Sequence, residues 1–291
     1  MTVDFCVDIG GTKIQYCLID EDNHVLPLGR TPTALMRRGT KAFAADLASL
    51  IEAVCPPGVA RVGVSLNGIL DRGHVVYSSL MGGLVDFPLQ AYLAERLKKT
   101  VHADDDLHAM GIAEARLVEA SRDRPVALLN IGTGIGIGFY DGAVLRGSYA
   151  AGLISEQPVY VEELGEYRSL DRTVCGRGMR EIYEKLCEDR AEAVTIFARA
   201  RLGEAAAQKT VRIFARYLGE TMQMISRFYH PERIAINGSI KHAAADFLGP
   251  ASDVYHDGLS KPFVAEIAIS PLDHAAERGV ILGLKEREEA F

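Results

Sequence analysis

The stretch VDFCVDIGGTKIQYCLID, residues 3–20, decides the fold of this chain. From Val3 to Asp8 apolar residues occupy every second position, and from Ile14 to Ile19 the residues are again β-prone. Two such runs joined by a short glycine-bearing segment predict a strand, a tight turn and a second strand. The turn falls on Gly10 and Gly11, which permit positive φ and leave room for a ligand to approach the backbone.

The residues around this turn suit a phosphate group. Asp8 precedes the two glycines, and Thr12 and Lys13 follow them with a hydroxyl and a cation. Gly-Gly is also a common two-residue hairpin turn. The stretch by itself therefore leaves open both a phosphate site and an ordinary hairpin.

The composition is that of a globular protein. Its 291 residues, 48% hydrophobic and 24% charged, can bury a large core in one or two domains. A net charge of −7 argues against binding nucleic acid or an anionic membrane. No apolar run reaches the roughly 18 residues of a membrane span, and the first predicted strand follows Met1 too closely for a signal peptide. We therefore expect a cytoplasmic protein.

The spacing of cysteine and histidine indicates no metal site. The five cysteines are odd in number and form no CxxC pair, and the histidines form no HExxH pattern. We expect reduced thiols, no disulfide framework and no structural zinc. The cysteines are Cys6, Cys17, Cys55, Cys175 and Cys187.

Beyond the first hairpin, predicted strands and helices alternate. A third strand is expected over residues 24–28, a helix over 41–54, and a strand over 62–64 that leads into Ser65-Leu66-Asn67-Gly68. A later strand, residues 101–103, ends in three aspartates. This alternation predicts an α/β domain, in which ligands gather at the carboxyl ends of strands.

The three aspartates, Asp104, Asp105 and Asp106, lie between that strand and a helix predicted from Leu107 to about Ala120. One or two acids at this position would cap the helix and complement its dipole. A third acid adds repulsion, which favours a functional role. The spacing alone leaves open both a helix cap and a catalytic acid.

A second glycine cluster, GTGIGIG at residues 132–138, follows an apolar strand. Its glycines fall at every second position, so it matches neither the G-x-G-x-x-G dinucleotide fingerprint nor a Walker A loop. Gly132, Thr133 and Gly134 instead predict a second strand-turn-strand hairpin. The two hairpins favour an internal duplication with two phosphate-binding turns.

Taken in order, these landmarks resemble the ROK family of sugar kinases, within the actin/hexokinase ATPase superfamily. The landmarks are DIGGTK, the acidic strand end, GTGIGIG, the segment VCGRGMREIY at 174–183 and the segment IAINGS at 234–239. The resemblance implies a two-lobed, ribonuclease H-like α/β duplication with mixed sheets. We expect residues 1–106 to form the smaller lobe, joined by a last helix within 274–291, and residues 107–273 to form the larger.

The resemblance also assigns roles. Asp104 would be the general base that accepts the proton of a primary hydroxyl as its oxygen attacks the γ-phosphorus of ATP. Asp8 would hold Mg²⁺ through water, and Gly238 and Ser239 would border the adenosine. The ATP phosphates would lie against Asp8, Gly10, Gly11, Thr12, Lys13, Gly132, Thr133 and Gly134. The substrate would lie against Ser65, Asn67, Gly68, Ala103, Asp104, Glu156 and Asp171.

Several positions depart from the family pattern. Ala103 replaces an Asn that contacts a ring hydroxyl, Leu153 and Glu156 replace a Glu and a His of the sugar site, and Asp171 replaces a Glu. Only Cys175 remains of a zinc cluster found in many relatives. These changes make the site more acidic, so we expect an amino sugar such as kanosamine. Glucose and a C7 cyclitol are the alternatives.

Two other classes of protein share the predicted fold. A ROK repressor would need an N-terminal helix-turn-helix, and only two residues precede the first strand. A sugar-sensing pseudokinase would lose catalytic groups, whereas Asp8, Thr12, Thr133 and Asp104 are present. A long helix predicted from Glu204 to about Tyr229 would form the centre of the second lobe or an interface between protomers. Relatives are commonly dimers, so we expect a homodimer.

Overall fold

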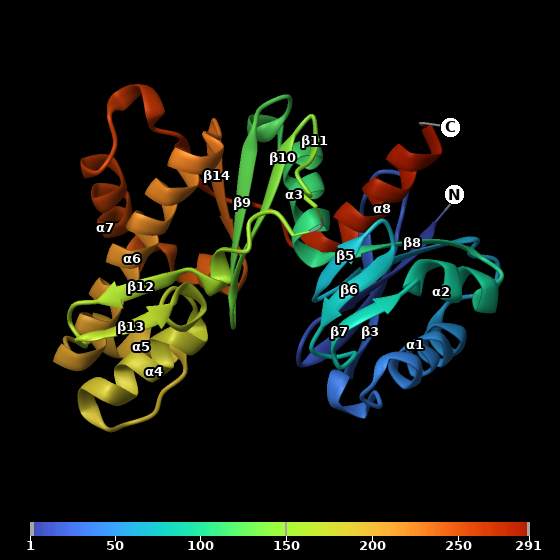
Figure 1. Cartoon of the computed structure of the whole chain (residues 1–291), viewed down its shortest axis with the longest axis horizontal. Helices are drawn as coiled ribbons and strands as arrows, with labels where there is room; N and C mark the ends of the chain where they lie inside the picture. Colours follow the sequence, from blue (N-terminus) through green and yellow to red (C-terminus); the bar gives the residue numbers. More distant parts are fainter. Residues whose placement is uncertain (1–2, 149, 290–291) are drawn as a thin grey trace. The chain divides into compact units, whose positions relative to one another are not determined.

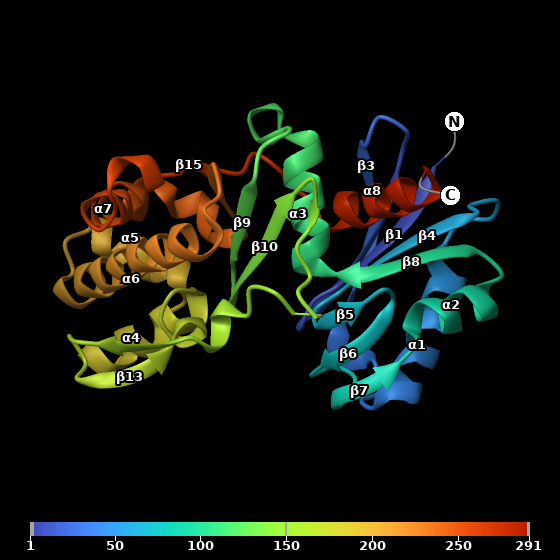
Figure 2. The same ribbon diagram turned by 45° about the horizontal axis from the view of Figure 1, so that its top comes forward.

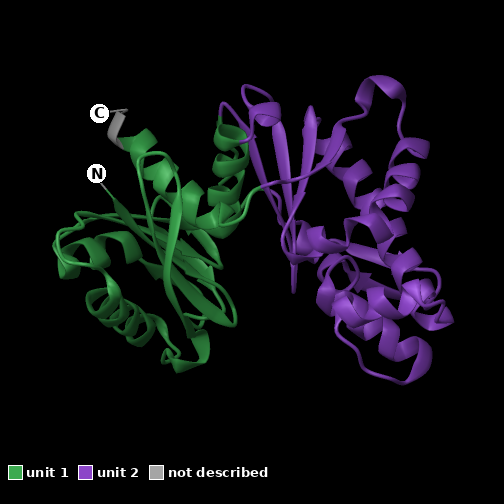
Figure 3. Cartoon of the chain, turned by 180° about the vertical axis from the view of Figure 1, so that it is seen from behind, with its two compact units in different colours: residues 1–117, 143–151, 272–291 green, residues 118–142, 152–271 purple. Residues whose placement is uncertain are grey.

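The structure is a computed structural model that describes residues 3–148 and 150–289. The chain forms two compact units (Figure 3). The first unit takes its residues from 1–117, 143–151 and 272–291, and the second from 118–142 and 152–271. Each unit therefore contains segments that are far apart in the sequence.

The first unit is built on a five-stranded mixed sheet (Figure 1). β1 pairs antiparallel with β2, and β2 with β3, so the predicted hairpin and third strand form an antiparallel meander. β1 also pairs in parallel with β4, and β4 with β8, which gives the order β3-β2-β1-β4-β8. The bounds are β1 Asp4–Ile9, β2 Lys13–Ile19, β3 Val25–Pro32, β4 Arg61–Leu66 and β8 Thr100–Asp105.

The two faces of this sheet are buried under different helices. Phe5, Val64 and Ala103 belong to one apolar cluster, which includes side chains of α1 and α2. On the opposite face, Cys6 and Cys17 pack with side chains of α3 and α8. Successive side chains of a strand point to opposite faces, so neighbouring positions enter different clusters. The helices are α1 Thr40–Val54, α2 Leu89–Leu97, α3 Asp106–Leu117 and α8 Ala275–Glu289.

A small sheet of three antiparallel strands completes the first unit. The turn between its first two strands contains Arg72 and Gly73, both with positive φ, as expected for a two-residue hairpin. The strands are β5 Ile69–Asp71, β6 His74–Ser78 and β7 Gly83–Phe87.

The second unit repeats the arrangement of the first. β9 and β10 form an antiparallel hairpin, β9 pairs in parallel with β14, and β14 pairs in parallel with β15. This order, a hairpin followed by parallel strands, matches β2-β1-β4-β8 and confirms the predicted duplication. The bounds are β9 Val126–Ile131, β10 Ile135–Asp141, β14 Arg233–Asn237 and β15 Glu266–Ile269.

The long helix α6 lies at the centre of the second unit, beside α5 and α7 (Figure 2). Phe214 of α6 meets Phe247 edge to face at a centroid distance of 5.2 Å, and Phe197 at 6.3 Å. Such pairs stabilise a core beyond the area they bury. The remaining elements are β11 Ala143–Val144, β12 Pro158–Val161, β13 Glu166–Ser169, α4 Gly176–Cys187, α5 Ala193–Arg201, α6 Ala205–Tyr229 and α7 Ala244–Asp257.

The units differ from the expected lobes in two places. The first unit extends to Leu117, because α3 packs closely on α8: a Cβ on Gly279 would lie 1.6 Å from the carbonyl oxygen of Ala109. The segment 143–151 also belongs to the first unit. Its Arg146 pairs with Asp104 of β8, a contact that no local sequence pattern indicates.

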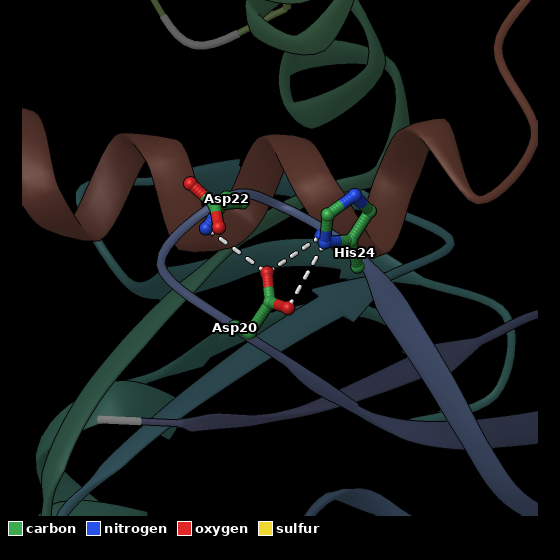
Figure 4. A group of neighbouring side chains, drawn as sticks. All are labelled: Asp20, Asp22 and His24. Carbon is green, nitrogen blue, oxygen red and sulfur yellow. Dashed lines mark hydrogen bonds and ion pairs between the residues drawn. The ribbon is translucent and has the colours of Figure 1, made fainter. Parts of the chain in front are cut away.

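An acidic group at the β2–β3 turn belongs to the hairpin (Figure 4). Asp20 Oδ1 accepts hydrogen bonds from the backbone N–H groups of Asp22 at 2.9 Å and His24 at 2.8 Å. These bonds lower the pKa of Asp20 and close the turn around Asn23, which has positive φ.

Over the residues that the structure describes, no helix is both long and apolar enough to span a membrane.

Candidate active site

Three parallel strands of the first unit bring predicted site residues together. Asp8 on β1 is the register partner of Ser65 on β4, and Ser65 is the partner of Asp104 on β8. Ser65 Oγ donates a hydrogen bond to Asp8 Oδ1 at 2.8 Å. The three residues stand at the carboxyl ends of their strands, where ligands bind in α/β sheets.

The first glycine turn lies next to this row. Gly11, Thr12 and Lys13 are exposed, and the N–H of Gly10 donates to the carbonyl of Lys13 at 3.0 Å. Neither Gly10 nor Gly11 uses the positive φ that glycine permits. A Cβ on Gly11 would meet no heavy atom within 4 Å, so glycine here leaves the backbone open to a ligand.

Asn67 and Gly68 follow β4 at the same end of the sheet. Asn67 Nδ2 donates a hydrogen bond to Asp106 Oδ2 at 3.3 Å. Position 68 requires glycine because the backbone of Tyr77 lies close to it: a Cβ there would be 2.5 Å from the carbonyl oxygen of Tyr77. Both residues thus help to fix the backbone beside the row of Asp8, Ser65 and Asp104.

Ala103 is not brought into this group. Its side chain is 1% exposed and lies in the core under α1 and α2, on the opposite face of β8 from Asp104. Its N–H donates to Gln90 Oε1 at 3.1 Å. The side chain at position 103 therefore contributes to packing. Ala103 in place of the family's Asn changes a residue that points away from Asp104.

Asp104 is buried and held by cations. Arg146 Nη1 donates to Asp104 Oδ1 at 2.8 Å, Arg146 Nη2 donates to Oδ2, and His108 Nδ1 lies 3.1 Å from Oδ1. Burial alone would raise the pKa of Asp104, but the hydrogen bonds from Arg146 and His108 outweigh it and lower the pKa below its usual range. Asp104 is therefore ionised at neutral pH.

Asp105, the next residue, caps α3 and contacts His108. Asp105 Oδ1 accepts from the backbone N–H of His108 at 2.7 Å and caps α3, while Asp105 Oδ2 lies 2.5 Å from His108 Nδ1. Burial by itself would lower the pKa of His108, but bonds with Asp104 and Asp105 raise it to about 9. Asp105 thus provides the helix cap that the sequence suggested, and Asp104 remains the candidate for the catalytic acid.

Asp8 is surrounded by other acids. Burial, followed by the charges of Glu277 and Asp106, raises the pKa of Asp8 to about 7. Burial and Asp105 also raise the pKa of Asp106 to about 7. Glu277, in the first turn of α8, is 3% exposed. Carboxylates that repel one another in this way fit a bound divalent cation, which prefers oxygen ligands.

The second glycine turn, Gly132–Gly134, joins β9 to β10 in the second unit. The N–H of Gly132 donates to the carbonyl of Gly134 at 2.9 Å, and the N–H of Gly176 donates to the carbonyl of Gly132 at 2.9 Å. Thr133 is exposed. The start of α4 therefore supports the turn from behind, because Gly176 is its first residue.

Asp171 lies against this turn. Its Oδ1 accepts a hydrogen bond from the N–H of Ile135 at 3.2 Å, and its Oδ2 accepts one from Arg177. A Cβ on Gly134 would lie 2.7 Å from Asp171 Oδ1. The carboxylate that the sequence assigned to a sugar contact is thus engaged by the backbone of the glycine turn.

Gly238 and Ser239 follow β14 beside the same turn. Gly238 has φ +86°, and a Cβ there would lie 2.3 Å from the carbonyl oxygen of Ile131. Ser239 Oγ would lie 3.8 Å from a Cβ on Gly132. The structure therefore brings together the predicted adenosine-side residues and the second glycine turn.

The sequence matches the ROK family over residues 4–281. This chain belongs to the ROK family. An N-acetylmannosamine kinase of Citrobacter koseri is 26% identical, with 94% of this chain and 95% of that protein covered. A glucokinase of Thermotoga maritima is 27% identical, with 97% and 96% covered. The crystal structure of a ROK glucokinase of Streptomyces griseus, in complex with glucose and AMPPNP, has a TM-score of 0.79 at 19% identity and covers 96% of this chain and 97% of its own.

In this ROK protein, Glu156 and Leu153 both lie in the second unit. Both are exposed, and Leu153 is 55% exposed. Cys175 is buried and acts as the N-cap of α4, where its Sγ accepts from the N–H of Gly178 at 3.4 Å. The remnant of the family's cysteine cluster therefore has a structural role in the helix.

The sequence interpretation missed three functional candidates of this ROK protein: His108, Arg146 and Glu277. His108 lies only four residues after Asp104, in the first turn of α3, so this short separation could have indicated the contact. Arg146 and Glu277 reach the site only through tertiary folding, from the segment 143–151 and from α8. No local pattern in the sequence points to either of them.

Proposed function

We propose that this chain is an ATP-dependent carbohydrate kinase that transfers the γ-phosphate of ATP to the primary hydroxyl of a hexose or hexose analogue. One observation carries the proposal: Asp104, ionised at a strand end, stands in register with Ser65 and Asp8 beside an open glycine turn. The kinase names of the relatives support it.

In the proposed mechanism Asp104 accepts the proton of the attacking hydroxyl. Its lowered pKa makes it a weak base before the reaction. Phosphoryl transfer through a loose transition state makes the hydroxyl acidic only late, so a weak but well-placed base suffices. Most of the rate would then come from positioning and from stabilisation of charge.

The glycine turns would bind the phosphates with their backbone N–H groups. Gly10–Lys13 offers an exposed turn with a hydroxyl and a cation, and Gly132–Gly134 offers a second turn supported by α4. Gly238 and Ser239 would border the adenosine. Asp8 would hold Mg²⁺ through water, and the raised pKa of Asp8 supports a cation at this position. When bound, Mg²⁺ would neutralise charge on the phosphates.

The range of substrates that we propose is wider than the amino sugar expected from the sequence. The acids invoked for an ammonium group have cationic partners: Asp104 pairs with Arg146, Asp105 with His108, and Asp171 with Arg177. Asp106 and Glu156 are the remaining acids that support an amino sugar such as kanosamine. Ser65, Asn67 and Gly68 would contribute polar contacts. We therefore propose a hexosamine or a neutral hexose, with a cyclitol as alternative, and a homodimer as the family resemblance implies.

A substrate panel tests the proposal. Glucose, glucosamine, kanosamine, N-acetylmannosamine, N-acetylglucosamine and a valiolone-type cyclitol would be compared by kcat/KM in a coupled ADP assay. Turnover of at least one of them with ATP and Mg²⁺ is expected. Absence of turnover throughout, with nucleotide bound, would favour a sugar-sensing protein. Glucose far above every amino sugar would exclude the kanosamine assignment.

The role of Asp104 has its own test. Asp104→Asn removes the proton acceptor at nearly unchanged volume, so kcat should fall by about a hundredfold or more. The Kd for ATP, measured by calorimetry, should change little. Asp86→Asn is a matched control, because Asp86 is an exposed acid of the same unit. Unchanged turnover in Asp104→Asn would remove Asp104 as the base.

A further inference from the structure

Arg146 engages both oxygens of the carboxylate that we propose as the general base. Its Nη1 donates to Asp104 Oδ1 at 2.8 Å, and its Nη2 donates to Oδ2. The side chain of Asp104 is 2% exposed, whereas that of Arg146 is 24% exposed. The guanidinium is thus the partner that meets solvent, and the base lies behind it.

Asp104 has little capacity left to accept a hydroxyl. Oδ1 is approached by Arg146 Nη1 at 2.8 Å, by the backbone N of Asp105 at 3.0 Å and by His108 Nδ1 at 3.1 Å. The single Nδ1 proton of His108 lies closer to Asp105 Oδ2, at 2.5 Å, so Arg146 Nη1 and the backbone N–H of Asp105 are the two donors that occupy the lone pairs of Oδ1. Oδ2 is taken by Arg146 Nη2, and His102 Nε2 lies 4.0 Å away. Oδ2 keeps one further lone pair, but Asp104 is 2% exposed and lies behind the guanidinium, so a substrate hydroxyl can come within the roughly 2.6–3.2 Å that proton transfer needs only when Arg146 moves.

Of these donors, Arg146 is the one placed to move. Asp105 belongs to β8 and His108 to the first turn of α3, two elements that pack in the core. Arg146 instead lies in the irregular segment after β11, directly before Gly147, whose φ is +58°. Glycine adopts such a conformation without steric cost, so the segment can rearrange more easily than a helix or a strand.

A second carboxylate can receive the guanidinium. Burial by itself lowers the pKa of Arg146, but the hydrogen bonds to Asp104 and then the charges of Asp104, Asp105 and Asp71 outweigh it. Asp71 stands at the end of β5, and its side chain is 40% exposed. Asp71 Oδ1 also lies 3.9 Å from Arg72 Nε. A shift of Arg146 towards Asp71 would keep a carboxylate near the guanidinium and so avoid the large cost of an uncompensated buried ion.

We propose that Arg146 is a positioning residue that competes with the substrate hydroxyl for Asp104, so that binding of the sugar displaces the guanidinium from the base. The proposal rests on the proposed function, in which Asp104 meets the primary hydroxyl. Only the fraction of molecules in which Arg146 has moved can bind the sugar productively. Arg146 thereby weakens the apparent affinity for sugar by that fraction.

Steady-state kinetics of Arg146→Gln separate this role from a structural one. Glutamine cannot form the paired, charged contact with Asp104, so the KM for the best sugar of the panel should fall by about tenfold, with kcat changed by less than about threefold. Arg146→Lys keeps the charge without the bidentate geometry, so its KM for sugar should lie between those of the wild type and Arg146→Gln. A rise of KM together with a loss of kcat would overturn the proposal, because it would mean that Arg146 binds the sugar or supports the base during turnover.

Arg37→Gln is the matched control for this experiment. Arg37 pairs with Asp46 on the surface of the same unit and is 68% exposed, so the same chemical change should leave both KM and kcat unaltered. An equal fall of KM in Arg37→Gln would show a general effect of charge and would overturn the assignment to Arg146.

A double-mutant cycle tests the contact without any activity. Unfolding of the wild type, Asp104→Asn, Arg146→Gln and the double variant would be compared in the absence of sugar. The two substitutions should be non-additive, with a coupling of about tenfold or more in the folding equilibrium constant. Additive effects would show that the pair does not form and would overturn the inference. The proposed function would fall separately, if the wild type turned over none of the sugars in the panel.

Discussion

Asp104 shows how one side chain is given its properties by neighbours from three parts of the first unit. Strand pairing places it beside Ser65, α3 supplies His108, and the segment 143–151 supplies Arg146. The two cations keep the carboxylate ionised although it is buried. The acid itself could be found in the sequence, but its charge state could not, because Arg146 is far from it along the chain.

The titration of His108 should be visible in the pH dependence of stability. Its pKa is about 9 in the folded protein, above the usual value near 6.5 in the unfolded chain. Its contribution is therefore fully present below about pH 6.5 and is lost as the pH rises through 9. The free energy of unfolding, measured with urea, should fall by up to about 3 kcal/mol between pH 6.5 and 10.

The variant His108→Asn provides the comparison for this measurement. Asn cannot carry the proton, so the loss of stability between pH 7.5 and 10 should be smaller in the variant than in the wild type. This window lies above the pKa of Asp8 and Asp106, both about 7, which limits their part in the slope. Parallel curves for the two proteins would show that His108 is not protonated in the folded state.

At the scale of elements, each glycine turn depends on a different support. The first turn is supported by Thr33, directly after β3, whose Oγ1 donates a hydrogen bond to the carbonyl of Gly10 at 2.8 Å. The second turn is held by α4 and by Asp171, which accepts from Ile135. The sequence predicted both turns, because glycines between β-prone runs have few alternatives. It did not predict the supports, which come from other elements.

The position of Asp171 leads to a prediction that differs from the sequence interpretation. Asp171→Ala removes the acceptor of the Ile135 N–H and should loosen the turn, so the KM for ATP should rise by about five- to tenfold. The KM for sugar should stay within about twofold. Asp189→Ala is the control, because Asp189 pairs with Arg199 on an exposed surface of the same unit. A rise in the sugar KM alone would restore Asp171 as a sugar contact.

At the scale of the whole chain, the last helix completes the first unit. Val280 and Ile281 of α8 share an apolar cluster with Cys6 of β1 and Ala109 of α3. Gly279 allows the two helices to touch, since a Cβ there would lie 1.6 Å from the carbonyl oxygen of Ala109. The first unit therefore cannot be complete until the end of the chain has been added.

Gly279→Ala should destabilise the first unit through this contact. The added Cβ forces the helices apart, and we expect a loss of about 3 kcal/mol, seen as a lower Tm in calorimetry. Gly249→Ala is the matched control, because Gly249 also lies in a helix but a Cβ there would meet no atom within 4 Å. The control should be neutral or slightly stabilising, as alanine favours helices. Equal Tm values for the two variants would contradict the close contact of α3 and α8.

The sequence by itself determined the strands, the two glycine turns, the acidic strand end and the duplicated α/β fold. These features depend on local periodicity and turn chemistry, which the residue order contains directly. Only the tertiary structure decided that Ala103 faces the core, that Asp171 supports a turn, that α3 belongs to the first unit and that Arg146 holds Asp104. Each of these depends on which residues meet across long separations in the chain, and burial and charge at such contacts are set by the fold.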